Sequence, residues 1–97
     1  MEVQSTSIFE EWLKNLKDLR GRNAIARRLQ VLEKHGHFGD CKHITGVIFE
    51  LRIHTGPGYR LYVAKRGEVL VILLCGGDKS TQQKDIIKAQ EIFKDLP

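Results

Sequence analysis

The sequence has few cysteines, few prolines and no long apolar run, and each scarcity excludes a class of protein. Its 97 residues include two cysteines and two prolines. Cys41 and Cys75 stand far apart, so neither a disulfide framework nor a cysteine metal motif is expected. The longest apolar run, residues 69–75, is far too short to span a bilayer, and no secretory signal is visible at the N-terminus. We therefore expect a cytoplasmic location, where cysteines stay reduced.

Metal-binding and nucleotide-binding motifs are also lacking. His35, His37 and His43 have poor spacing for metal ligands. The run Lys79-Ser80-Thr81 matches the end of a Walker phosphate loop, but Asp78 stands directly before the lysine, where the motif requires glycine, and would repel a phosphate. We therefore expect no metal and no cofactor.

The chain does have a globular composition and an uneven distribution of charge. Hydrophobic residues make up 41% and charged residues 29%, which predicts a single domain over residues 1–97. Residues 20–66 carry ten lysines and arginines against three acids, an excess of seven positive charges. This excess predicts an anionic partner, either a nucleic acid or an acidic protein. A solvated basic helix is the alternative interpretation.

Three consecutive strands are predicted between residues 46 and 79. Apolar and polar residues alternate in 46–54, which is typical of a half-buried strand. The alternation resumes in 59–65 after a Gly-Pro-Gly turn, and 69–75 is apolar throughout, as in a strand covered on both faces. We expect a two-residue turn at Arg66-Gly67 and another turn at Gly76-Gly77-Asp78.

The pairing of the first two strands places two arginines side by side. If the apolar residues of both strands share one face, Arg52 stands directly opposite Arg60 on the other face. Arginines in such a position repel each other, so the arrangement favours an anion bound between them. The alternative is an ion pair with Glu50, with Asp78 or with an acid of the last helix.

Helices are predicted on both sides of the strands. A capping box at Ser7–Glu10 begins a first helix, and Asp18 caps a second helix that stops at Gly36. A second capping box at Ser80–Gln83 begins the last helix.

The predicted order of elements gives the fold class. Residues 2–5 form an expected edge strand through Val3, and 35–43 form a polar connection. We therefore predict an α+β domain of two layers, in which an N-terminal helical hairpin covers one face of an antiparallel meander. The other face is expected to be only partly covered.

Five short stretches carry a family likeness: Phe9-Glu10-Glu11-Trp12-Leu13, Gly39-Asp40-Cys41-Lys42, Glu50-Leu51-Arg52-Ile53-His54, Gly56-Pro57-Gly58-Tyr59-Arg60, and Leu74-Cys75-Gly76-Gly77-Asp78-Lys79-Ser80-Thr81-Gln82. With the order of elements, they resemble the RelE/ParE superfamily of toxin–antitoxin toxins, most closely the HigB-like branch of addiction module killer proteins. The likeness covers essentially the whole chain. It implies a RelE-like fold and an endoribonuclease, or mRNA interferase, that cleaves mRNA, usually in the ribosomal A site, and so inhibits translation. It also implies neutralisation by an antitoxin, in this branch a helix-turn-helix DNA-binding protein.

The resemblance also implies roles for particular residues. It assigns catalytic roles to Arg52, to Arg60 after the Gly-Tyr turn, and to Lys79 after the last strand. The tyrosine that some members carry near the C-terminus has no counterpart here. The general acid and the general base are therefore not assigned by the resemblance.

The chemistry of RNA cleavage without a metal fits these residue types. The 2′-OH must lose a proton, the phosphorane must be stabilised, and the 5′-oxygen must gain a proton. Arginine suits the second task because its planar fork pairs with phosphate oxygens. His54 could transfer a proton because imidazole titrates near neutral pH; the alternative is an ordinary residue beside a turn. The residues expected to bind RNA, by base stacking or by charge, are Tyr59, Tyr62, Lys42, Arg27 and Arg28. For Tyr62, packing is the alternative.

Two other functions stay open at this point. One is a ParE-like poison of DNA gyrase, which does not cut RNA and does not need Arg52, His54 and Arg60 together. The other is a degenerate toxin that is kept as a partner-binding domain. A separate expectation concerns the antitoxin, which should cover the arginines or displace the C-terminal helix.

Overall fold

The α+β class predicted from the sequence is confirmed by a computed structural model that describes all 97 residues. In chain order the elements are β1 (Glu2–Ser5), α1 (Ser7–Asn15), α2 (Leu19–His35), β2 (Cys41–Thr45), β3 (Ile48–Ile53), β4 (Tyr59–Arg66), β5 (Leu70–Asp78), a 3-10 turn (Lys79–Thr81) and α3 (Gln82–Asp95).

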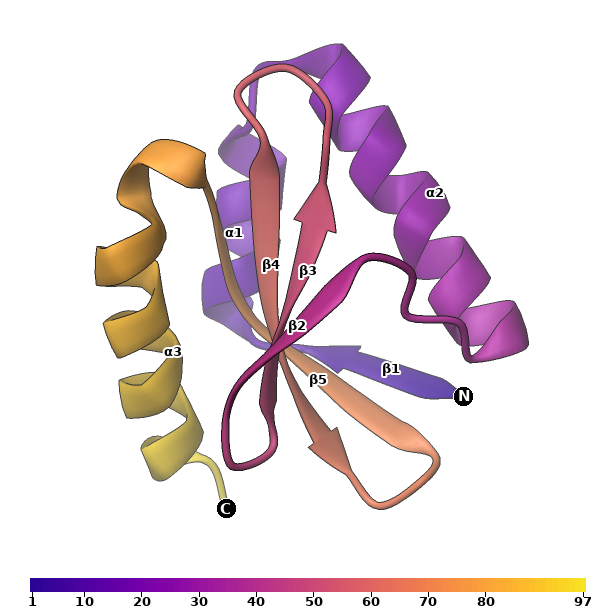
Figure 1. Ribbon diagram of the computed structural model, residues 1–97, viewed down its shortest axis with the longest axis vertical. Coiled ribbons are helices and arrows are strands. Elements are labelled where there is room, and N and C mark those ends of the chain that lie inside the picture. Colours follow the sequence, from indigo (N-terminus) through magenta and orange to yellow (C-terminus); the bar gives the residue numbers. More distant parts are fainter.

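The five strands form one mixed sheet in the order β1-β5-β4-β3-β2 (Figure 1). β1 runs parallel to β5, and the other three pairings are antiparallel. The edge strand expected through Val3 is therefore present, and Val3 pairs with Val71. β3 and β4 lie inside the sheet, and each has a paired strand on both sides. Their side chains therefore point alternately to the two faces of the sheet.

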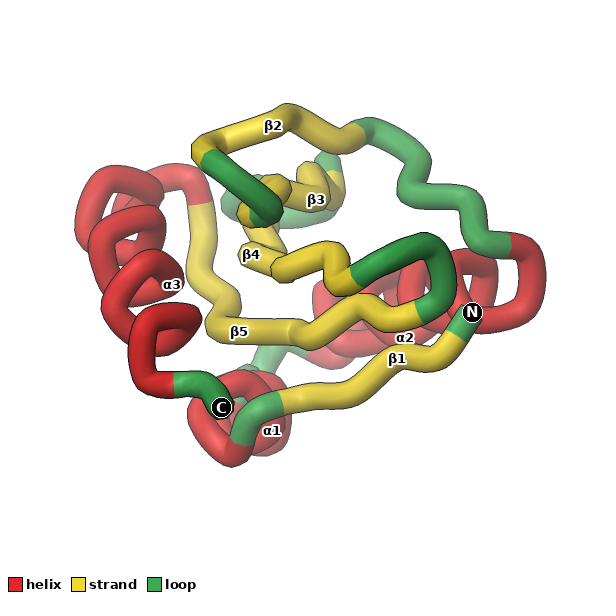
Figure 2. The backbone as a smooth tube through the Cα atoms, turned by 90° about the horizontal axis from the view of Figure 1, so that it is seen from below, coloured by secondary structure: helices red, strands yellow, loops and turns green.

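Helices cover the two faces of the sheet unequally. Figure 2 shows α1 and α2 together on the side of the sheet away from α3. On the first face, Ile25 and Leu32 of α2 are buried against Leu61 of β4. On the second face, Ala89 of α3 is buried with Ile72 of β5. None of the three helices is long and apolar enough to cross a membrane.

The first helix begins at a different cap from the one predicted. Thr6, not Ser7, is the N-cap, and its hydroxyl accepts a hydrogen bond from the Phe9 N–H at 3.1 Å. The same hydroxyl donates to the Leu74 carbonyl at 2.7 Å, which ties the start of α1 to β5. The stop predicted for α2 is correct, because Gly36 takes the left-handed conformation, with φ of 66°, that glycine adopts easily.

Part of the predicted polar connection belongs to the sheet. Residues Cys41–Thr45 form β2, which pairs with β3 along the edge. The turn expected at Arg66-Gly67 is also longer than two residues. β4 ends at Arg66 and β5 begins at Leu70, so three residues connect them.

The turn predicted at Gly76-Gly77-Asp78 is wrong. These residues continue β5, which stays paired with β4 as far as Tyr59 and Asp78. A side chain at Gly76 would collide with the Trp12 ring, and one at Gly77 with the Asp85 carboxylate. The two glycines therefore allow side chains of α1 and α3 to approach the backbone of β5 closely.

The last helix follows a cap that the sequence did not reveal. The Asp78 carboxylate accepts a hydrogen bond from the Ser80 N–H at 2.8 Å and begins the 3-10 turn. α3 then starts at Gln82. The predicted capping box at Ser80–Gln83 is therefore replaced by one that begins at Asp78.

Candidate active site

Arg52 and Arg60 stand directly opposite each other on β3 and β4, as the register predicted. Arg60 pairs on its other side with Gly77 of β5, which has no side chain. Because paired residues point to the same face of a sheet, both arginines belong to the face that α3 partly covers. The structure therefore brings together the two residues on which the proposed chemistry depends.

Arg60 is buried without partners. The residue is 8% exposed, and its Nε and Nη1 atoms have no hydrogen-bond acceptor. An unsatisfied buried donor costs about 1–3 kcal/mol, and more when the group is charged. An anion that reached this guanidinium would satisfy these donors and replace the water they have lost.

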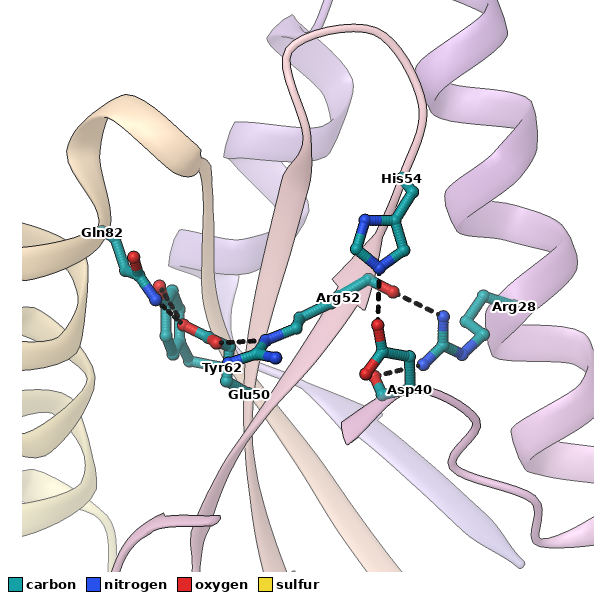
Figure 3. Close-up of polar contacts among 7 residues, drawn as sticks. All are labelled: Arg28, Asp40, Glu50, Arg52, His54, Tyr62 and Gln82. Atoms are coloured by element: carbon teal, nitrogen blue, oxygen red, sulfur yellow. Dashed lines mark hydrogen bonds and ion pairs between the residues drawn. The ribbon is translucent and has the colours of Figure 1, made fainter. Parts of the chain in front are cut away.

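Arg52 has one acidic partner. Its Nε donates to Oε1 of Glu50 at 3.1 Å, and its side chain is 30% exposed (Figure 3). The ion pair considered as an alternative therefore exists for Arg52, whereas no acid bonds to Arg60. The contact uses Nε alone, which leaves the two terminal nitrogens of Arg52 for another group.

Glu50 was not predicted as a site residue, although it shares a strand face with Arg52. It is fully buried, and its Oε2 accepts hydrogen bonds from Tyr62 Oη at 3.1 Å and from Gln82 Nε2 at 2.8 Å. Burial alone would raise the pKa of the Glu50 carboxyl. The hydrogen bonds from Gln82, Arg52 and Tyr62, with the charge of Arg60, outweigh burial and lower this pKa. The carboxylate is therefore ionised at neutral pH.

His54 belongs to a second network, on the α2 side of Arg52. Its Nε2 lies 2.5 Å from Oδ2 of Asp40, and its side chain is 70% exposed. The hydrogen bond with His54 lowers the pKa of the Asp40 carboxyl. Figure 3 shows this pair pointing away from the contact between Arg52 and Glu50. Asp40 was not predicted, because the loop that carries it precedes β3 by several residues.

Arg28, which was expected to bind RNA, has a structural role in the fold. Its guanidinium donates to the Phe38 carbonyl through Nε at 3.0 Å and through Nη2 at 2.6 Å. It also donates to the Arg52 carbonyl at 2.8 Å and to the Asp40 carbonyl at 2.7 Å. These bonds fasten the loop before β2 to α2 and to β3. Arg27 is exposed and lines a cleft of about 490 Å³ beside them.

Both tyrosines expected to stack on a base are buried. Tyr59 packs in the core beneath α1 and α2, and its hydroxyl donates to Asp18 at 2.6 Å. Burial, followed by this hydrogen bond, raises the pKa of Tyr59 to about 12. Tyr62 lies under α3 and donates to Glu50. The base stacking expected of both residues is therefore corrected to packing, because neither ring is presented at the surface.

The two predicted lysines are exposed at the rim of the site. Lys42 of β2 pairs with Glu50 and so belongs to the face of the arginines. Lys79 lies in the 3-10 turn, where its N–H donates to the Gly58 carbonyl at 2.8 Å. Neither ammonium group makes an ion pair, so both add positive charge near the site.

Comparison with known proteins agrees with a toxin-like fold. The model of the family described as phage-derived protein Gp49-like (DUF891) matches residues 11–94. An uncharacterized protein of Haemophilus influenzae is 48% identical over 96 residues, which cover 99% of this chain and 96% of that protein. The Gp49-like family is associated with toxins of toxin–antitoxin modules. The chain therefore belongs to the phage-derived Gp49-like family, a RelE/toxin-like family.

Proposed function

We propose that this protein is the toxin of a toxin–antitoxin module of the HigB-like kind, and that it inhibits translation by cleaving mRNA without a metal. Membership of a toxin-like family supports the first part. The second part depends on one observation: Arg60 holds a buried guanidinium without an acceptor directly opposite Arg52. Cleavage of mRNA, on or off the ribosome, would take place in the cytoplasm.

The arginine pair fits the phosphate at the bond that breaks. The 2′-oxygen loses its proton and attacks the neighbouring phosphorus, which forms a pentavalent phosphorane. The 5′-oxygen then leaves and takes up a proton. Both guanidinium groups would donate to the non-bridging oxygens, whose negative charge grows as the phosphorane forms. Loss of one such donor typically lowers a rate by about 10²–10³-fold.

His54 is the proton-transfer group in this proposal. It follows β3 two residues after Arg52, and both residues line the cleft of about 490 Å³. The contact between Nε2 and Asp40 leaves Nδ1 for the substrate. A carboxylate that orients the imidazole in this way is a common feature of proton-transfer sites.

Primer extension on cellular mRNA after induction tests the nuclease function. Wild-type protein is expected to produce new 5′ ends, and Arg60→Ala to produce none while the protein still purifies as a folded monomer or complex. Arg22→Ala is the matched control, because Arg22 is exposed on α2 with no side-chain partner. Intact transcripts with the wild type would overturn the proposal. Inhibition of purified DNA gyrase that survives Arg60→Ala would favour the gyrase poison instead.

The partner we propose is an antitoxin with a helix-turn-helix DNA-binding domain. An acidic or amphipathic segment of it would bind the basic middle of the chain, where lysines and arginines exceed acids by seven. Coexpression of the two neighbouring gene products should give a complex that copurifies and that blocks cleavage. The absence of any complex at micromolar concentrations would contradict this part of the proposal.

A further inference from the structure

A buried carboxylate stands beside the arginine pair. Glu50 lies two residues before Arg52 on β3 and directly opposite Tyr62 on β4. It is 0% exposed. A buried charge is costly unless hydrogen bonds and opposite charges replace the lost water. The contacts of Glu50 therefore indicate what the carboxylate does.

Each oxygen of this carboxylate has a separate task. Oε2 is held by Tyr62 from β4 and by Gln82 from the first turn of α3. Oε1 accepts the Nε–H of Arg52. The carboxylate is thus oriented on one side and orients the arginine on the other, which is visible in Figure 3. Because Arg52 is held through Nε, its terminal nitrogens keep a fixed direction and stay free.

Charge gives Glu50 a second task. The arginine pair carries two positive charges, and the ionised carboxylate of Glu50 cancels one of them. The remaining charge of plus one matches the single negative charge of a phosphodiester. Without the carboxylate, the pair would repel more strongly and would hold any RNA phosphate more tightly. Binding that is equally strong for substrate and transition state does not raise the rate of the chemical step.

We propose that Glu50 is a positioning residue that directs Arg52 toward the phosphate and sets the net charge of the phosphate site. The inference rests on the nuclease function proposed above. Glu50 is not assigned contact with RNA, because both of its oxygens already have partners inside the protein. It acts through Arg52 alone.

The substitution Glu50→Gln tests this role, because it keeps the shape of the side chain and removes the charge. A short RNA with 2′-O-methyl groups throughout cannot be cleaved and reports affinity only. Its affinity should rise by up to about fivefold, the factor that one unit charge gives at ~4 Å in the dielectric of bulk water, because Arg52 stands between Glu50 and the phosphate. On cleavable mRNA, free and bound to programmed ribosomes, kcat should fall roughly tenfold to a hundredfold, because a neutral amide oxygen holds the Arg52 guanidinium less firmly than the carboxylate does.

Glu68→Gln is the matched control. Glu68 is exposed in the loop between β4 and β5, so its substitution changes the net charge by the same amount. Affinity and kcat should both stay at the wild-type level. Equal tightening by both variants would overturn the proposal, because the effect would then come from overall charge. Weaker RNA binding by Glu50→Gln would overturn it as well.

Two further variants separate positioning from charge and decide the matter if Glu50→Gln does not fold. Tyr62→Phe and Gln82→Met each remove one donor and keep the carboxylate charged. Each should lower kcat by a smaller factor and leave the affinity for methylated RNA unchanged; an unchanged kcat in both would contradict the positioning role. A wild type that cuts no RNA would refute the nuclease function, and the affinity comparison would then still decide whether Glu50 sets the charge of the site.

Discussion

The two faces of the sheet come from the same strands and differ in what they bury. The face under α1 and α2 is apolar, with Leu51, Leu61 and Val63 fully buried. The two buried charged residues of the protein, Glu50 and Arg60, both belong to the face under α3. On the first face every buried group has a suitable neighbour, whereas on the second a guanidinium lacks acceptors.

The difference shows how β3 and β4 divide stability from function. Successive side chains alternate between the faces, so Leu51 and Leu61 stabilise the fold while Glu50, Arg52 and Arg60, one position along, form the site. Unsatisfied polar groups cost stability and persist where function requires them. The comparison therefore favours the α3 face as the location of the proposed function, and this assignment can be tested by substitutions on each face.

Arg60→Met should have the largest effect: a large loss of cleavage without a loss of stability. Cleavage is expected to fall by about 10²–10³-fold, since a donor to the phosphorane is lost. The free energy of unfolding should stay the same or rise, by up to about 1–3 kcal/mol, because an unsatisfied buried group is removed. Urea unfolding followed by circular dichroism, with cleavage measured on the same samples, checks both. A large loss of stability would show that Arg60 supports the fold.

Leu61→Ala should produce the opposite result on the other face. Truncation of this fully buried side chain should lower the free energy of unfolding by about 2–5 kcal/mol. The cleavage rate per folded molecule should not change, because Leu61 points away from the arginines. The same unfolding and cleavage measurements test this, and a selective loss of cleavage in a stable variant would contradict the division between the faces.

Arg28→Leu should have a smaller effect on stability. The four hydrogen bonds of Arg28 to three carbonyls would be lost, at a cost of about 1–3 kcal/mol. Amide hydrogen exchange in residues 36–40 should become faster. Arg27→Leu serves as the control, because Arg27 is exposed beside it. Equal destabilisation by both variants would show that Arg28 has no special structural role.

Acid should remove the contribution of Glu50 to stability. Its pKa in the folded protein is lowered from the ordinary value of 4.5, so its contribution to stability is complete above that value and is lost as the pH falls through the lowered pKa. Thermal melts below pH 4.5 should therefore show a loss of stability that is smaller in Glu50→Gln. Identical pH dependence of the two proteins would contradict the ionised state assigned to Glu50.

Alkali should have little effect on stability up to about pH 10 and a large effect near pH 12. Both tyrosines have raised pKa values, that of Tyr59 to about 12, chiefly through burial. Their contribution to stability is complete below the ordinary tyrosine pKa of 10 and is lost as the pH rises through about 12. The ultraviolet absorbance of tyrosinate should stay low at pH 10 and then increase together with unfolding. Tyrosinate formation in a folded protein at pH 10 would contradict the burial of both rings.

The sequence predicted the opposed arginines because strand alternation is a local property. Arg52 and Arg60 are joined by a short turn, and one apolar face fixed their register. The partners of Glu50 and Arg28 were not predictable in this way, because Gln82 is 32 residues from Glu50 and Arg28 is 24 residues from Arg52. The wrong turn at Gly76-Gly77 has a similar cause. Glycine signals both a turn and a close approach, and only the positions of Trp12 and Asp85 distinguish the two.

A double-mutant cycle on Arg52→Gln and Arg60→Met in single-turnover cleavage of mRNA tests the central claim most directly. If both guanidinium groups hold the same phosphate, the double variant should be only slightly less active than the less active single variant. Groups that act as a unit have strongly non-additive effects. Losses that multiply would show that the two arginines act on different parts of the substrate, and would contradict a shared phosphate site.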